Sequence, residues 1–401
     1  MRAGGDLDVI REGLTVVLQA LIDAEAAQLI GADRYERSAS RTTHRNGTRA
    51  RLLSTKAGDV ELRIPKLREG SFFPALLEPR RRIDRALLAV VMEAYVHGTS
   101  TRKVDDLVKA LGVDAGISKS EVSRICAELD AEVAAFRSRS LAHTSFPYVF
   151  VDATYLKARV DGRVVSRAVV IATGVTVDGG REVLGLDVGD SEDGAFWTAF
   201  LRSLRARGLA GVQLVISDAH TGLKQAISAV MAGTSWQRCR VHFLRNVLAR
   251  VPRGSAEMVA AAIRTIFAQP TGAEVTEQVD KVAAMLQPKF PAVATMLADA
   301  REDLTAFAAF PVAHWTKLWS TNPLERVNKE IKRRTNVVGI FPDDAAVLRL
   351  AGAVLIEAHD EWQVAERRYL SEGSMAKLTQ TSDHDRRPKE VKRATAELVA
   401  T

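Results

Sequence analysis

One short apolar stretch that reaches a carboxylate constrains this fold more than any other feature of the chain. Residues 147–156 read Pro-Tyr-Val-Phe-Val-Asp-Ala-Thr-Tyr-Leu, in which Tyr148, Phe150 and Asp152 alternate with two valines. Period-two alternation with β-branched and aromatic residues predicts a buried strand that ends at Asp152. Because a lone ionised carboxylate is costly to bury, Asp152 should meet water, a cation or a hydrogen-bond donor. Capping of a local turn is the ordinary alternative.

The composition indicates a soluble chain of several domains. Its 401 residues suffice for two or three domains, each with its own core. Lys and Arg number 56 against 49 Asp and Glu, and the net charge of +7 suits a polyanionic partner without requiring one. Two cysteines, Cys126 and Cys239, are too few for a four-thiolate zinc site or a disulfide framework. The N-terminus has no apolar signal core and Glu93 interrupts the apolar run at residues 86–96, so we expect no membrane segment.

The N-terminal region combines an apolar helical pattern with a basic stretch. Residues 9–31 have apolar residues at helical spacing, which predicts an amphipathic helix and a candidate dimer surface. Residues 41–85 are rich in Lys and Arg and include a strand-like segment at 59–65. Phosphate contacts are expected in this stretch, which includes the run Arg80, Arg81 and Arg82. A solvated basic surface is the ordinary alternative.

Three further helices are predicted at residues 84–97, 100–111 and 118–137. The second and third are joined by a short glycine-containing turn, the layout of a helix-turn-helix. The sequence Ser-Lys-Ser-Glu opens the third helix as a capping box. Its exposed first turns would meet base edges through Lys119, Ser120, Ser123 and Arg124. Helix pairs of this kind also serve purely as packing units. Because composition changes near residues 138–140, a DNA-binding and dimerisation region is assigned to residues 1–140.

A sheet is predicted after this region. Strands at 147–156, 164–173 and 183–188 are separated by Asp-Gly and Asp-Gly-Gly turn signals, which favour antiparallel hairpins. A helix at 191–207 and a short strand ending at Asp218 follow. This order resembles a ribonuclease H-like mixed sheet, in which the first and fourth strands are neighbours. Asp152 and Asp218 are therefore expected to converge.

A third carboxylate is predicted on a later helix. In residues 322–334, Asn322 can cap the helix and Pro323 fits its first position. Helical spacing places a carboxylate, an amide and two cations on one face, formed by Glu325, Asn328, Lys329 and Lys332. Completion of a capping box with Asn322 is the ordinary role for Glu325. The rival acid, Glu330, is explained by pairing with Arg326 and Arg334.

Three converging carboxylates need compensating positive charge. Two unit charges about 4 Å apart repel by roughly 4 kcal/mol at an effective dielectric of 20. Oxygen-rich sites suit Mg²⁺ or Mn²⁺, and a pair of such ions can activate water or a 3′-hydroxyl for phosphoryl transfer. The predicted chemistry is therefore metal-dependent phosphoryl transfer on nucleic acid.

Five ordered motifs carry a family resemblance. They lie at residues 149–157, 196–208, 216–223, 236–248 and 321–334. With them the chain resembles the Mutator-type transposases of bacterial insertion sequences, which belong to the Asp-Asp-Glu class with a ribonuclease H-like core. The resemblance implies that Asp152, Asp218 and Glu325 bind two Mg²⁺ or Mn²⁺ ions per active site. One departure is Ala219-His220, which stands where a glycine is expected after Asp218.

The resemblance also implies residues that support catalysis. Lys332 occupies the basic position that follows the glutamate in the family, and Lys329 and Arg333 lie beside it as further DNA contacts. Cys239 and His242 are implied to support the active site, while a zinc site is the alternative for their C-x-x-H spacing.

The resemblance divides the rest of the chain around an insertion. The core would occupy residues 145–228 and 313–369, interrupted by an all-helical insertion at 229–312 and followed by a loosely ordered polar tail at 370–401. Trp236, Trp315 and Trp319 stand near the junctions of the insertion, with buried packing or stacking on DNA bases as their alternative roles.

The expected protein is a cytoplasmic, nucleoid-associated transposase of the α/β class. We expect it to bind terminal inverted repeats in double-stranded DNA as a homodimer or higher oligomer, with neither a membrane nor a small-molecule cofactor. A nuclease or resolvase that cuts without joining and a non-catalytic DNA-binding regulator are the alternatives.

Overall fold

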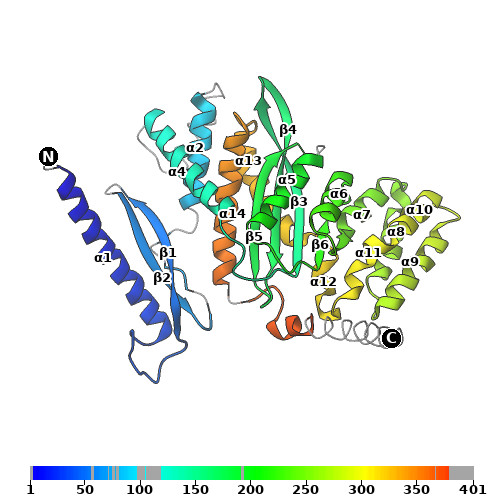
Figure 1. The fold of residues 1–401 in the computed structure, drawn as a ribbon, viewed down its shortest axis with the longest axis horizontal. Coiled ribbons are helices and arrows are strands. Elements are labelled where there is room, and N and C mark those ends of the chain that lie inside the picture. Colours follow the sequence, from blue (N-terminus) through cyan, green and yellow to red (C-terminus); the bar gives the residue numbers. More distant parts are fainter. Residues whose placement is uncertain are drawn as a thin grey trace, which may run out of the picture. The chain divides into compact units, whose positions relative to one another are not determined.

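The computed structural model describes residues 3–55, 58–70, 72–74, 77, 81–96, 104, 119–190, 194–365 and 367–378. The chain divides into two compact units, Met1–Arg81 with Asp360–Arg367 and Arg82–His359 with Arg368–Thr401 (Figure 1). Each unit contains its own cluster of buried apolar side chains. How the chain is divided more finely, including a boundary near residue 140, stays a prediction.

The first unit packs one long helix on a two-stranded antiparallel sheet. It contains α1 (Ala3–Ile30), β1 (Arg45–Thr55) and β2 (Gly58–Leu67). Val60, Leu62 and Ile64 lie two residues apart on β2 and bury one face of the strand against Ile22 and Ala26 of α1. The helix predicted at residues 9–31 is confirmed. β2 confirms the strand-like segment predicted at residues 59–65, whereas its partner β1 was not predicted. The two strands pair because alternating apolar side chains give the hairpin a face to bury.

Helix α1 also has the length and composition of a membrane-spanning segment. Arg11–Ile30 has a mean hydropathy of 1.4, and it is the one such helix in the described part of the chain. Ile22, Ala26 and Ile30 on one side of α1 are fully buried, with Ile22 and Ala26 in the core shared with β2. We therefore interpret it as a helix of a folded domain.

The second unit begins with two of the three predicted helices. They are α2 (Arg81–Val96) and α4 (Lys119–Ser138), which confirm the predictions at 84–97 and 118–137. The predicted helix at 100–111 and the turn at 112–117 lie outside the described residues except for Val104, so the helix-turn-helix stays a prediction. Arg85 of α2 and Glu128 of α4 form an ion pair of 2.7 Å.

A five-stranded mixed sheet forms the centre of the second unit. Its strands are β3 (Tyr148–Val160), β4 (Arg163–Val175), β5 (Arg181–Gly189), β6 (Leu214–Ser217) and β7 (Ser235–Arg238), in the order β5-β4-β3-β6-β7. Neighbours are antiparallel from β3 to β5, and β6 pairs in parallel with both β3 and β7. The adjacency of the first and fourth strands confirms the sequence prediction. Asp161 and Gly162 both have positive φ, 51° and 74°, as the predicted tight hairpin between β3 and β4 requires.

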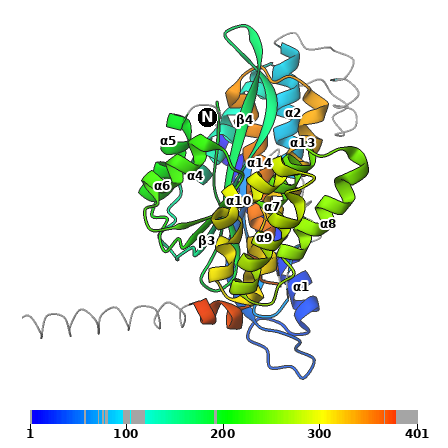
Figure 2. The same ribbon diagram turned by 90° about the vertical axis from the view of Figure 1, so that its right-hand side faces the viewer.

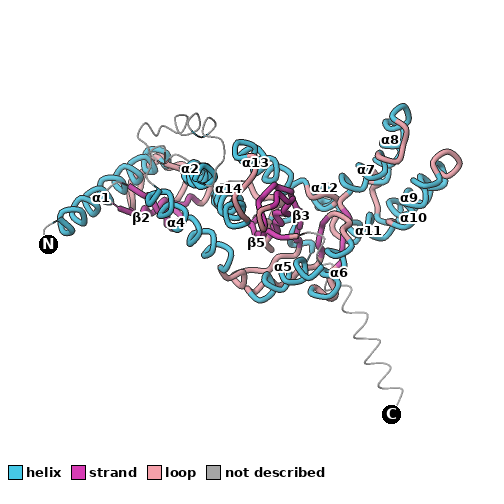
Figure 3. The backbone as a smooth tube through the Cα atoms, turned by 90° about the horizontal axis from the view of Figure 1, so that it is seen from above, coloured by secondary structure: helices cyan, strands magenta, loops and turns pink. Residues whose placement is uncertain are grey.

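Helices cover both faces of this sheet. One face is covered by α5 (Gly194–Ala206) and α6 (Thr221–Val230), and the other by α13 (Asn322–Val338) and α14 (Asp344–Val364) (Figures 2 and 3). Val149 and Val151 of β3 point into the core with α5 and α6. Alternation along the strand therefore directs Tyr148, Phe150 and Asp152 to the opposite face.

The segment between β7 and α13 is helical. It contains α7 (Arg240–Leu248), η1 (Arg253–Ser255), α8 (Ala256–Ile266), α9 (Gly272–Leu286), α10 (Pro291–Asp299), α11 (Arg301–Thr305), η2 (Ala306–Ala309), η3 (Val312–His314) and α12 (Trp315–Leu318). The expectation of several helices is confirmed, but the prediction that residues 229–312 are all helical is wrong at β7, which lies within these bounds and pairs with β6. Trp315 and Trp319 pack edge-on against Phe307, as the packing alternative for these residues predicts.

The chain remains ordered beyond α14. Residues 372–378 are helical, and Leu370, Met375 and Leu378 are buried. The amide of Leu370 donates to the carbonyl of Gly179 at 3.1 Å. The prediction of a loosely ordered tail is wrong for residues 370–378, because three apolar side chains anchor them. Residues 379–401 lie outside the described part.

Candidate active site

Asp152 lies on β3 just beyond the residues that pair in parallel with β6. β3 is buried as far as Asp152, and from there buried and exposed side chains alternate along it. Asp152 itself is 8 % exposed. The prediction that the strand ends at Asp152 is wrong, because β4 pairs with β3 as far as Val160. It is β6 that ends beside this position.

Asp218 follows the last residue of β6. The parallel register matches Tyr148 with Leu214 and Phe150 with Ile216. Extending that register by two residues brings Asp152 opposite Asp218. One carboxylate oxygen of Asp218 accepts from the amide of Ala219 at 2.7 Å. The strands that carry the two acids are therefore neighbours, as the sequence predicted, and the convergence of the carboxylates on one ion stays a prediction.

Glu325 lies in the first turns of α13, which packs against β3. The helix begins at Asn322 with Thr321 in the N-cap position, so the predicted capping by Asn322 is wrong. Glu325 is then the fourth helical residue, one position beyond that of a capping box. Because of this one-residue shift, Glu325 does not complete a capping box.

Asn328, one turn after Glu325, contacts Asp152 directly. Its side-chain amide donates to Oδ2 of Asp152 at 2.9 Å. The other oxygen of Asp152 accepts from the amide of Ala153 at 3.0 Å. Asn328 was placed on the same helical face as Glu325 but was not included among the predicted site residues. Its position three residues after Glu325 was the only signal available in the sequence.

The surroundings of Asp152 make its charged form unfavourable. The pKa of Asp152 is raised to about 6, chiefly by burial and also by the charges of Asp218 and Glu325, against the lowering effects of His242 and of the hydrogen bond from the Ala153 amide. Both other predicted acids thus lie within electrostatic reach of Asp152. That the three carboxylates form one metal site stays a prediction.

The chemistry of this site fits a hard divalent cation. Its carboxylate oxygens carry excess negative charge, and Oδ1 of Asn328 is buried with no hydrogen-bond partner among the described residues. Oxygen donors of this kind suit Mg²⁺ or Mn²⁺. In the described part of the chain, however, no three His, Cys, Asp or Glu side chains are gathered closely enough to form a ready metal site. The oxygen donors are therefore of the kind that suits such an ion, but their side chains are not arranged around a single position.

Cys239 and His242 lie beside the carboxylates. Cys239 is fully buried at the start of α7, and its sulfur accepts from the amide and the hydroxyl of Thr321, both at 3.4 Å. Burial opposes ionisation of the Cys239 thiol, but hydrogen bonds from His242 and Thr321 lower its pKa overall. Hydrogen bonding to Cys239, together with the charges of Asp218 and Asp152, raises the pKa of His242 to about 9. The pair therefore links β7 to the start of α13 and presents a cation to the acidic site.

Comparison with known proteins identifies the family. Residues 2–365 match the family model described as "Transposase, Mutator family". The chain belongs to the Mutator family of transposases.

Its similarity to named members of this family extends over most of the chain. It is 49% identical over 364 residues to the transposase for insertion sequence element IS1081 of Mycobacterium tuberculosis, covering 90% of this chain and 87% of the relative. It is 40% identical over 363 residues to the transposase for IS406 of Burkholderia multivorans, covering 90% and 93%. It is 37% identical over 366 residues to the transposase for IS256 in transposon Tn4001 of Staphylococcus aureus, covering 91% and 93%.

The basic residues of α13 that were predicted to contact DNA differ in whether they form ion pairs within the protein. Lys329 and Lys332 are exposed on α13, whereas Arg333 forms an ion pair of 2.7 Å with Glu330. Hydrogen bonding from Arg333 also lowers the pKa of Glu330 to about 2, and Arg334 adds to the effect. Glu330 is thus a paired acid as predicted, with Arg334 as one expected partner and with Arg333 in place of Arg326 as the other. DNA contact by the three basic residues stays a prediction.

The predicted contacts nearer the N-terminus are less fully described. Ser123 and Arg124 are exposed on α4, where Arg124 pairs with Glu128 at 2.8 Å. For Arg81, Arg82 and Lys119 the structure describes only the helical backbone, and Arg80 lies outside the described residues. Their role in DNA binding stays a prediction.

Proposed function

We propose that this chain is the transposase of an insertion sequence, and that it cuts and joins DNA strands by metal-dependent phosphoryl transfer. Family membership supports a transposase. The observation that supports the chemistry is the parallel pairing of β3 with β6, which carries Asp152 and Asp218 on neighbouring strands, with Glu325 within electrostatic reach of Asp152. The strand order β5-β4-β3-β6-β7 supports assignment of the core to the ribonuclease H-like class.

Asp152, Asp218 and Glu325 would hold two Mg²⁺ or Mn²⁺ ions. When bound, such a pair supplies Lewis acidity and lowers the pKa of a coordinated water or 3′-hydroxyl. The protein's part is to hold the carboxylate of Asp152 in a fixed orientation. Asn328 fixes one oxygen of Asp152 and the Ala153 amide fixes the other. Protonated His242 offsets part of the negative charge before an ion binds.

Binding of the element's terminal inverted repeats is assigned to the residues before about residue 140, with Lys329 and Lys332 contacting the backbone near the cut. A dimer or higher oligomer would hold two transposon ends together. The protein would act as a soluble enzyme on double-stranded DNA.

The test uses purified protein and duplex oligonucleotides that carry the element's own end and a second, target duplex. In Asp152→Asn, Asp218→Asn and Glu325→Gln, strand cleavage and joining are expected to disappear, while end binding stays close to that of the wild type. Glu330→Gln on the same helix is the matched control and retains cleavage. Full cleavage by Asp152→Asn contradicts the proposal. Cleavage without any joined product would identify a nuclease or resolvase instead.

A further inference from the structure

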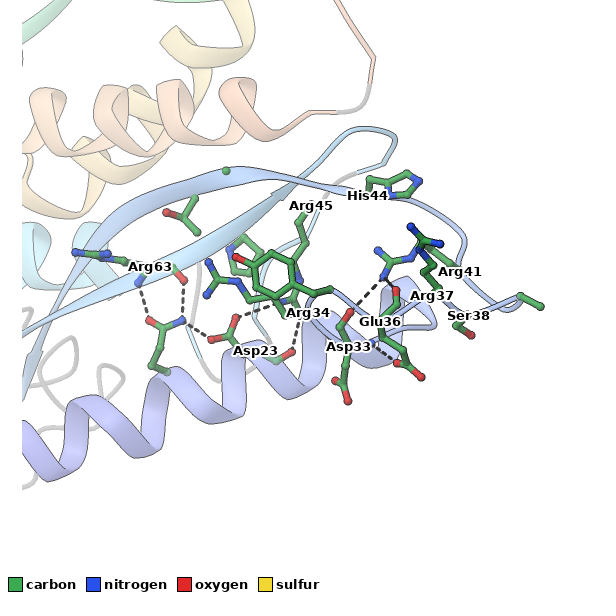
Figure 4. A pocket seen from close by; sticks show the side chains of 16 residues that line it. Asp23, Asp33, Arg34, Glu36, Arg37, Ser38, Arg41, His44, Arg45 and Arg63 are labelled. Carbon is green, nitrogen blue, oxygen red and sulfur yellow. Dashed lines mark hydrogen bonds and ion pairs between the residues drawn. The ribbon is translucent and has the colours of Figure 1, made fainter.

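The first unit contains an open pocket of its own. It has a volume of about 1030 Å³ and lies between the end of α1, the start of β1 and the loop that joins them (Figure 4). Its wall carries several arginines, among them Arg34, Arg37 and Arg63, and one exposed tyrosine. Arg63 lies within the basic stretch 41–85 where phosphate contacts were expected, whereas Arg34, Arg37 and the tyrosine were not among the predicted DNA contacts.

Hydrogen bonds hold the loop at residues 31–44 in place. Arg41 donates to the carbonyl of Asp33 at 3.2 Å and also to the carbonyl of Glu36. A carboxylate oxygen of Glu36 accepts from the amide of Asp33 at 2.7 Å, and the Ser40 hydroxyl donates to the carbonyl of Gly31 at 2.8 Å. A loop fixed in this way loses little conformational freedom when a ligand binds.

Tyr35 occupies the tip of this loop in an unfavourable conformation. Its φ is 67°, in the left-handed region that residues with a side chain rarely adopt, and it is 89 % exposed. The guanidinium of Arg34 lies 5.3 Å from the centre of the tyrosine ring. The loop therefore presents an aromatic ring and a cation together to solvent, and strain of this kind is concentrated at binding sites.

The charges of the pocket are only partly neutralised. Arg45 is committed to α1, because it donates to the carbonyl of Asp23 at 3.1 Å and its charge lies 3.7 Å from the Asp23 carboxylate. In the described residues, no carboxylate forms an ion pair with Arg34, Arg37 or Arg63. Three guanidinium groups thus remain available on one concave surface.

We propose that this pocket binds the sugar-phosphate backbone of the transposon-end duplex. Arg34, Arg37 and Arg63 contact successive phosphates, and Tyr35 packs its ring against a deoxyribose or a base edge. Guanidinium groups match phosphate oxygens in geometry, and an aromatic ring beside them suits the less polar parts of a nucleotide. The inference rests on the proposed function and extends that function by naming the surface of the first unit that binds DNA.

The test measures affinity for the end duplex by fluorescence anisotropy at several salt concentrations. Arg34→Ala, Arg37→Ala and Arg63→Ala are combined in one full-length variant. Each lost phosphate contact lowers the slope of log affinity against log salt by about 0.9, so the slope is expected to fall by up to about 2.7. The matched control removes three exposed arginines of the second unit, Arg202, Arg205 and Arg264, and retains the wild-type slope.

Tyr35 is tested separately from the charges. Tyr35→Gly removes the ring yet tolerates the left-handed backbone, so it avoids the strain that alanine would keep. It is expected to weaken end binding without changing the salt slope, and Tyr35→Phe is expected to bind as the wild type does. An unchanged Tm in each variant excludes unfolding as the cause.

Phosphate-ethylation interference localises the contact. The triple arginine variant is expected to lose one patch of interfering phosphates that the wild type and the control variant retain. Wild-type affinity, slope and interference pattern in that variant overturn the inference, while cleavage by the wild type keeps the proposed function intact. A wild type that neither binds the end duplex above a scrambled duplex nor cleaves it overturns both.

Discussion

Asn328 of α13 donates a hydrogen bond of 2.9 Å to Asp152 of β3, across 176 positions of sequence. This contact fixes the orientation of the most buried of the three acids and joins the helix that carries Glu325 to the strand that carries Asp152. A positioning residue of this kind adjusts a metal ligand without touching the substrate.

Replacement of Asn328 should therefore impair catalysis more than DNA binding. Asn328→Ala is expected to lower the rate of strand cleavage by about 10- to 100-fold, the usual effect of losing a partner of a metal ligand, and to raise the Mg²⁺ concentration for half-maximal activity. Asn336→Ala, at an exposed position of the same helix, is the matched control. An unchanged Mg²⁺ requirement in Asn328→Ala would show that the bond has no bearing on ion binding.

The raised pKa of Asp152, about 6, predicts an acidic limit to activity. An ion binds the ionised carboxylate, so cleavage at low Mg²⁺ should fall as pH drops through about 6. Because the ion competes with the proton, raising the Mg²⁺ concentration should move this midpoint to lower pH. The measurement is a set of single-turnover cleavage profiles at several Mg²⁺ concentrations. A midpoint pH that does not change with the Mg²⁺ concentration would contradict the assignment of Asp152 as a metal ligand.

The raised pKa of His242 predicts that the stability of the protein depends on pH in the alkaline range. Its folded value of about 9 exceeds the ordinary 6.5, so its contribution to the free energy of unfolding is complete below about pH 6.5 and is lost as pH rises through about 9. The difference in free energy of unfolding between the wild type and His242→Gln should therefore shrink between pH 6.5 and 9.5. Cys239→Ala should lower the pKa of His242 in an NMR titration. A pH-independent difference would exclude this coupling.

A second ionic cluster should matter for stability alone. Arg349 of α14 is 4 % exposed and binds both oxygens of Asp130 at 2.9 and 2.8 Å, and also the carboxylate of Glu93. Arg349→Ala removes a buried guanidinium and leaves the partly buried Glu93 without its cation, while the exposed Asp130 stays in water, so the free energy of unfolding should fall by about 3 kcal/mol. Arg301→Ala breaks the exposed pair with Asp280 and should cost no more than about 1 kcal/mol. Chemical denaturation measures both, and equal losses would contradict the importance of burial.

Local patterns were sufficient to predict the elements that carry the three acids. Alternation identified the β3 stretch, and the run ending at Asp218 identified β6. Helical spacing placed Glu325 and Asn328 on one face of α13. Each of these patterns spans only a few residues, so it can be recognised in the sequence without knowledge of the rest of the fold.

Features set by distant contacts escaped the same reasoning. The length of β3 depends on its pairing with β4, and the bond between Asn328 and Asp152 depends on how α13 packs on the sheet. β7 has only four residues, too few for a clear alternation, and becomes a strand by pairing with β6. Residues 370–378 look polar in sequence, yet three buried apolar side chains anchor them.

The central claim is that Asp152, Asp218 and Glu325 form one metal-binding unit. The most direct measurement is a Mn²⁺ titration followed by electron paramagnetic resonance, with the end duplex bound to the full-length protein. The wild type and Glu330→Gln are predicted to bind two ions per chain, and Asp152→Asn, Asp218→Asn and Glu325→Gln are each predicted to bind fewer or to bind them far more weakly. Two tightly bound ions in a variant that lacks all three carboxylates would contradict the account.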